Sequence, residues 1–85
     1  MSLMKGGMKM TEPMMEKSAI AWLDAQAGLY RSRPKRFSPH EVTTAVGGYP
    51  PTLGRVAGAV VSELISRGIK IRYLTQGSKR WFELF

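Results

Sequence analysis

The chain has 85 residues, enough for one small domain. It contains no cysteine, one histidine and one aspartate, which excludes disulfides and thiolate chemistry and leaves too few residues for a catalytic triad or a histidine-based metal centre. We therefore expect no enzyme, no catalytic residue, no metal, no cofactor and no small-molecule substrate. No apolar run approaches the roughly 18 residues of a membrane span, so we expect no membrane partner and a cytoplasmic protein, associated with the nucleoid if it is bacterial.

The formal net charge of +7 is unevenly distributed. Residues 1–30 hold three cations and three carboxylates, whereas residues 31–85 hold ten cations and three carboxylates. A field of this sign attracts polyanions, and nucleic acid is the commonest polyanion in a cell. A basic surface that serves only solubility is the alternative interpretation.

The N-terminal part divides into a leader and a first helix. Residues 1–10 show no periodicity, and we expect a disordered leader, in part an expression scar, ahead of a single domain over residues 11–85. A first helix is predicted over about residues 12–27, because its apolar residues recur at spacings of three and four. Gly28 follows as a stop signal.

A basic connector and a second helix come next. Residues 31–36 read RSRPKR, which fits either a solvated loop or a phosphate-contacting one. The following FSPHEV motif predicts a helix start, with Ser38 as N-cap, Pro39 in the first turn and Glu41 closing a capping box. The second helix is expected over about residues 39–46, and two glycines end it.

The last third of the chain predicts an amphipathic helix and a β-hairpin. A third helix is expected over about residues 52–67, with apolar residues at i, i+3, i+4 and i+7 and a terminating glycine. The period then changes from 3.6 to 2. Two strands, at about 69–74 and 80–85, are predicted around a glycine-containing turn over residues 75–79.

This order of elements resembles the winged helix-turn-helix family of DNA-binding domains. The resemblance rests on FSPHEV, GGYPPT, TLGRVAGAVVSELISRG and IKIRYLTQGSKRWFEL, and it covers residues 12–85. It implies an α+β fold of three helices followed by a C-terminal hairpin. In that family the third helix enters the major groove, and the hairpin loop, or wing, touches the flanking DNA.

The resemblance implies an interface made of the polar side of the third helix and the wing, the two parts that the core does not need. Arg55 is the only long cation in the first two turns of that side, and its planar fork suits the O6 and N7 acceptors of guanine. The cations of the wing and the connector would neutralise phosphates. The expected DNA-binding set is Thr52, Arg55, Ala59 and Ser62 in the third helix, Gln76, Ser78, Lys79 and Arg80 in the wing, and Arg33, Lys35 and Arg36 in the connector.

Two glycines of the third helix have two interpretations. Gly54 and Gly58 suit a close approach of the helix to DNA, and they equally suit packing against the first or second helix.

The orientation of the last strand is also undecided. Trp81, Phe82 and Phe85 cannot all face one side of a strand with a period of two. The sequence does not decide which of these three side chains lie on the buried face of the strand.

The expected function is double-stranded DNA binding, sequence-specific or semi-specific, by a small transcriptional regulator. Because few side chains could read bases, one copy would discriminate weakly, which favours a homodimer. The main alternative is a winged-helix docking module that binds protein without contacting nucleic acid. RNA binding is a third hypothesis.

Overall fold

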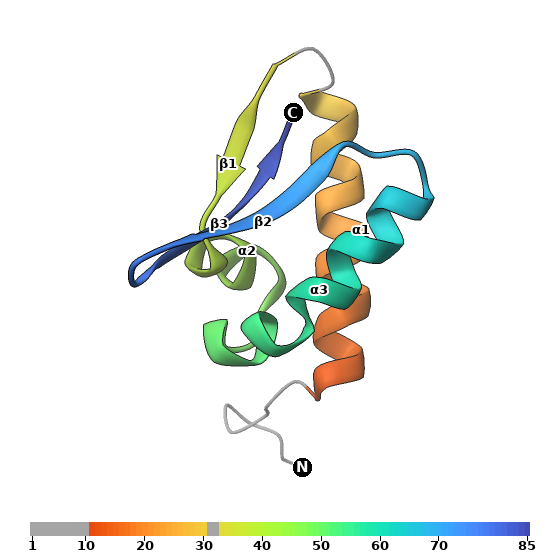
Figure 1. Cartoon of the computed structure of the whole chain (residues 1–85). Coiled ribbons are helices and arrows are strands. Elements are labelled where there is room, and N and C mark those ends of the chain that lie inside the picture. Colours follow the sequence, from red (N-terminus) through yellow and green to blue (C-terminus); the bar gives the residue numbers. More distant parts are fainter. Residues whose placement is uncertain (1–10, 31–32) are drawn as a thin grey trace.

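The computed structural model describes residues 11–30 and 33–85, and in these ranges the chain forms three helices and a three-stranded antiparallel sheet (Figure 1). The elements in chain order are α1 (Glu12–Leu29), β1 (Lys35–Phe37), α2 (Pro39–Val46), α3 (Pro50–Ser66), β2 (Ile71–Gln76) and β3 (Lys79–Leu84). The predicted α+β class and the three predicted helices are confirmed. The expected leader over residues 1–10 lies outside the described residues.

Helix α1 begins where the sequence predicts and ends later. The Thr11 side chain accepts a hydrogen bond from the backbone N–H of Met14 at 3.4 Å, which caps the helix. The helix continues through Gly28 to Leu29, so the expected stop at Gly28 is wrong. Gly28 does not take a positive φ, the conformation in which glycine ends helices. The buried side of α1 consists of Met15, Ala19, Ile20 and Leu23.

The capping box of α2 is confirmed. The Glu41 backbone N–H donates to Ser38 Oγ at 3.0 Å, and the Ser38 backbone N–H donates to Glu41 Oε1 at 3.0 Å. At the other end, Gly47 and Gly48 have φ values of 91° and 94°, which side chains with a Cβ rarely adopt. The two glycines therefore allow the tight turn that leads from α2 into α3.

Helix α3 begins with Pro50 and Pro51 after Tyr49, one or two residues earlier than expected. No side chain caps this end. Proline has no backbone N–H, so two of the N–H groups that lack an intrahelical partner at the start of a helix are missing here. The two prolines thus set the start of α3 without a polar cap.

The sheet contains a strand that the sequence did not reveal. The strand order is β1-β3-β2, and β1 pairs antiparallel with β3 through Lys35↔Leu84 and Phe37↔Phe82. The basic connector is therefore partly an edge strand, not only a loop. Phe37 anchors it, because this side chain is only 3% exposed.

The hairpin is longer at its tip than predicted. Strands β2 and β3 pair from Ile71↔Leu84 to Gln76↔Lys79, which leaves a turn of two residues, Gly77 and Ser78. The predicted hairpin is present, but the expected strand bounds of 69–74 and 80–85 and the expected five-residue turn are wrong. Gly77 has a φ of 63° whereas Ser78 does not have a positive φ, which fits a type II′ turn.

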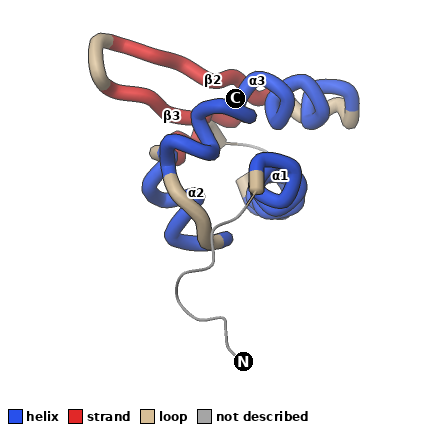
Figure 2. Tube along the Cα trace, turned by 90° about the horizontal axis from the view of Figure 1, so that it is seen from below, coloured by secondary structure: helices blue, strands red, loops and turns tan. Residues whose placement is uncertain are grey.

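The helix-facing side of the sheet completes the core. Phe82 and Leu84 are buried on this side, while Trp81 and Glu83 point to the opposite, outer face, which settles the open question about strand β3. Figure 2 shows α1 and α2 on the same side of the β2–β3 hairpin. The largest fully buried side chains come from all three helices and both hairpin strands: Met15, Leu23, Val42, Leu53, Val60, Leu64, Ile71 and Phe82. Among the described residues, no helix combines the length and apolarity needed to cross a membrane.

Candidate nucleic-acid interface

The outward side of α3 is the first part of the candidate interface. Arg55, Ala59 and Ser62 are exposed, as expected. Thr52 is buried, with 9% exposure, so its expected place in the interface is wrong. At about 100° per residue, Thr52 falls only about 40° from Val56 around the helix axis. It therefore lies on the edge of the buried stripe, and not on the outward side.

The charge of α3 itself is zero, which the sequence argument overlooked. Its two charged residues are Arg55 and Glu63. In addition, Arg55 Nη1 lies 3.9 Å from Glu12 Oε2 of α1. Both of these side chains are well exposed, so the pair is weak and a phosphate or a base can replace the carboxylate. Helix α3 can thus supply base contacts, but little of the electrostatic attraction.

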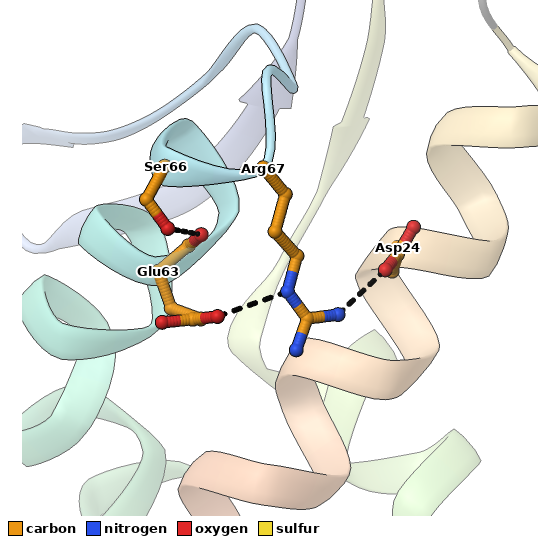
Figure 3. Close-up of polar contacts among 4 residues, drawn as sticks. All are labelled: Asp24, Glu63, Ser66 and Arg67. Atoms are coloured by element: carbon orange, nitrogen blue, oxygen red, sulfur yellow. Dashed lines mark hydrogen bonds and ion pairs between the residues drawn. The ribbon is translucent and has the colours of Figure 1, made fainter.

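Arg67, at the C-terminal end of α3, is engaged within the protein (Figure 3). Its Nε donates to Glu63 Oε2 at 3.0 Å, and its Nη1 donates to Asp24 Oδ2 of α1 at 2.7 Å. These hydrogen bonds, first that to Glu63 and then that to Asp24, raise the pKa of Arg67 above its usual value. Arg67 therefore fastens the end of α3 to α1, and its charge is compensated there.

The hairpin tip, residues 76–80, is the second part of the interface. Gln76, Ser78, Lys79 and Arg80 are all exposed, and neither cation forms an ion pair with a described residue. Strand alternation directs Arg80 toward the helices, and its Nη1 lies 4.0 Å from the position that a Cβ on Gly54 would occupy. Arg80 therefore connects the hairpin tip with the N-terminal half of α3 in one continuous surface.

The connector cations do not join this surface. Lys35 pairs with Leu84, five residues along β3 from Lys79, which corresponds to about 17 Å of extended strand. The Lys35 ammonium lies 5.5 Å from the centre of the Tyr30 ring. Arg33 precedes this strand and is exposed at the same end of the sheet. The structure thus separates Arg33 and Lys35 from the hairpin tip with which they were grouped.

Arg36 has a third location. It lies in the middle of β1 opposite Glu83, and its Nε donates to Glu83 Oε2 at 3.2 Å. Alternation along β1 places it on the outer face of the sheet, away from Phe37. The expected set of eleven residues therefore falls into the α3 and hairpin-tip surface, the Arg33–Lys35 end, Arg36 on the outer face, and the buried Thr52.

The glycines of α3 are not required by packing within the protein. A Cβ on Gly58 would meet no described atom within 4 Å, and a Cβ on Gly54 would meet only the Arg80 guanidinium, at an ordinary contact distance. The interpretation that these glycines allow close packing against α1 or α2 is therefore wrong. The other interpretation, a close approach of α3 to DNA, stays a prediction.

More than half of the Lys and Arg side chains belong to the sheet and the residues that flank its strands. Residues 33–37 and 69–85 together hold seven Lys and Arg side chains and one carboxylate, Glu83. Sequence reasoning missed Arg72 and Lys70 as surface cations, although their alternation with Ile69, Ile71 and Tyr73 already indicated an exposed basic side of the strand. Within the described ranges, no group of three or more metal-ligating side chains comes together.

Comparisons with protein-family models, with curated proteins and with solved structures find no match for this chain. The assignment of function therefore rests on the geometry and charge of the surface described above.

Proposed function

We propose that this chain binds double-stranded DNA as a small winged-helix regulator. The outward side of α3 lies in the major groove, and the hairpin tip, as the wing, contacts the adjacent sugar-phosphate backbone. The observation that carries the proposal is the position of Arg80 beside Gly54, because it makes α3 and the hairpin tip one surface with two uncompensated cations. The order of three helices, with a short strand between α1 and α2 and a hairpin after α3, also fits a winged-helix layout.

The two parts of this surface have different tasks. Lys79 and Arg80 neutralise phosphates, which gives affinity that falls with salt and carries little sequence information. Arg55 exchanges its weak pairing with Glu12 for the acceptors of a guanine edge. Gly58 and Ala59 present almost no side chain, so the backbone of α3 can approach the groove floor closely.

The small number of base-reading side chains on α3 predicts modest discrimination between DNA sequences. Among the exposed residues of its outward side, Arg55 and Ser62 offer hydrogen-bond donors that can reach base edges, whereas the Ser66 hydroxyl donates to the Glu63 carbonyl oxygen at 2.6 Å. A single copy then binds many sites with similar affinity, and two copies on a palindromic site supply the missing specificity. A homodimer on DNA is therefore part of the proposal.

A specific observation favours a second candidate, a protein-docking module. Ile65 of α3 is 55% exposed and Tyr49, just before α3, is 53% exposed. Exposed apolar residues on and beside a helix of this kind are typical of a surface that contacts protein. In this alternative α3 and Tyr49 contact a partner protein, and the cations serve only as a polar rim.

Selection from random duplexes, followed by affinity measurements at several salt concentrations, separates these candidates. The proposal predicts duplex binding that weakens steeply with salt. Replacing Arg55 by Ala should cost about 1–3 kcal/mol on the selected site and less on other sequences. A matched control, Lys17→Ala on α1, should change neither value. Absence of duplex binding, or binding indifferent to salt, would favour the docking module instead.

A further inference from the structure

The outer face of the sheet carries an array that meets the proposed duplex interface only at the hairpin tip. Strand pairing places three rows on this face: Arg36, Glu83 and Arg72 in the first, Trp81 and Leu74 in the second, and Lys79 and Gln76 in the third. Neighbouring rows lie about 7 Å apart along the strands. Trp81 and Leu74 are only half-buried, and the exposed Phe85 follows the first row. Cations therefore flank an apolar, aromatic strip on both sides.

Glu83 fixes the two arginines of the first row. Its Oε1 accepts a hydrogen bond from Arg72 Nε at 2.7 Å, and its Oε2 accepts one from Arg36 Nε at 3.2 Å. These bonds, that of Arg72 first, hold the pKa of Glu83 below its usual value although partial burial opposes this shift. One carboxylate thus orients two guanidinium groups and leaves the row with a net positive charge.

Each of these guanidinium groups lies over an aromatic ring. Arg36 Cζ is 5.0 Å from the centre of the Trp81 ring, and Arg72 Cζ is 4.5 Å from the centre of the Phe85 ring. Only the Nε atoms of Arg36 and Arg72 form hydrogen bonds with described residues, so the Nη groups can donate to a ligand. The two arginine side chains are 65% and 53% exposed. The outer face of the sheet therefore presents two exposed guanidinium groups, each lying over an aromatic ring.

This chemistry fits unstacked nucleotides better than a duplex or an acidic peptide. Free Nη groups bind phosphates, while guanidinium planes and aromatic rings offer stacking surfaces for bases. The bases of a duplex are stacked on each other and cannot reach a flat sheet, whereas those of a single strand can. An acidic peptide would use the cations and leave the aromatic strip without a role.

We propose that the outer face of the sheet binds single-stranded nucleic acid, with phosphates at Arg36 and Arg72 and bases stacked along Trp81 and Phe85. This site adjoins the duplex surface only at the hairpin tip, where Gln76 and Lys79 lie. Arg36, Arg72, Trp81 and Phe85 are not part of the duplex surface, and Arg55 and Arg80 do not lie on the outer face of the sheet. The two proposals can therefore fail independently of each other.

The test measures the affinity of the full chain for a labelled oligothymidylate of twelve nucleotides and for a twelve-base-pair duplex that contains the selected sequence, at one salt concentration. The double substitution of Arg72 and Phe85 by Ala should weaken single-strand binding about tenfold or more, and should change duplex affinity less than about twofold. Arg55→Ala is the matched control and should show the reverse pattern. Circular dichroism verifies that each variant is folded, and both replaced side chains lie outside the core.

Tryptophan fluorescence provides a second measurement on the natural side chains of the site. Trp22 is the other tryptophan, so the variant Trp22→Phe leaves Trp81 as the sole reporter. Oligothymidylate should quench this emission by stacking, and polyglutamate should neither quench it nor compete. An unchanged emission with oligothymidylate, equal competition by polyglutamate, or an equal loss of duplex affinity in the Arg72 and Phe85 variant would each overturn the proposal.

Discussion

Gly58 allows a test in which the stability of the fold and the proposed function respond in opposite directions. It is the ninth of the 17 residues of α3, it is exposed, and a Cβ added to it would meet no described atom within 4 Å. Glycine in a helix interior costs about 0.8–1.0 kcal/mol relative to alanine. Nothing in the structure offsets this cost, so Gly58→Ala should stabilise the chain by nearly the full amount.

The expected gain can be measured directly. For a domain of this size, about 1 kcal/mol corresponds to an increase in Tm of about 4–8 °C, measured by far-ultraviolet circular dichroism during thermal unfolding. The larger substitution Gly58→Leu should also stabilise the helix, but it should weaken duplex binding because its side chain separates α3 from the groove floor. Gly28→Ala is the matched control, because Gly28 lies in α1, outside the proposed duplex interface, and a Cβ added to it also meets no described atom within 4 Å. A lower Tm for Gly58→Ala, or unchanged duplex affinity for Gly58→Leu, would refute the reasoning.

Three further predictions concern the hairpin tip, the turn before α3 and the carboxylate of the sheet. Replacing Lys79 and Arg80 together by Gln should reduce the slope of log affinity for duplex against log salt concentration by about 1.8. The loss of affinity between 50 and 200 mM salt is then about tenfold smaller than in the natural chain. An unchanged slope would place the hairpin tip away from DNA. Gly47→Ala should lower the free energy of unfolding in urea by about 1–3 kcal/mol, because alanine is strained at a φ of 91°, and an unchanged midpoint would contradict this. Since the pKa of Glu83 is lower in the folded state than its ordinary value of 4.5, its stabilising effect is present above about pH 4.5 and is lost as the pH falls through the folded pKa. The stability advantage of the natural chain over Glu83→Gln should therefore shrink in acid, and an advantage that is constant with pH would contradict the role of the two arginines.

Local chemistry explains which elements the sequence could predict. The capping box of Ser38 and Glu41 joins residues three apart, so its hydrogen bonds depend on no distant part of the chain. The apolar stripe of α3 is also a local pattern, and it correctly placed Arg55, Ala59 and Ser62 outside. The prediction for Thr52 failed because its polarity was taken to mean that its side chain is exposed, although its angular position lies at the edge of the buried stripe.

The missed features depend on distant partners. Strand β1 has three residues, too few for a recognisable alternation, and Arg36 bonds to Glu83, 47 residues later. Without β1 the outer face of the sheet could not be assembled from the sequence, and Arg36 was grouped with Arg33 and Lys35. The hairpin register was likewise hidden, because the polar residues at its exposed end carry no hydrophobic pattern.

The most direct test of the central claim is chemical-shift mapping of the backbone amides during titration with a duplex from the selection experiment. We predict that the largest shifts fall in α3 and at the hairpin tip, at Arg55, Ala59, Ser62, Ser78, Lys79 and Arg80, while the exposed side of α1 around Lys17 stays unchanged. Shifts concentrated on α1, or no shifts on addition of duplex, would contradict the account.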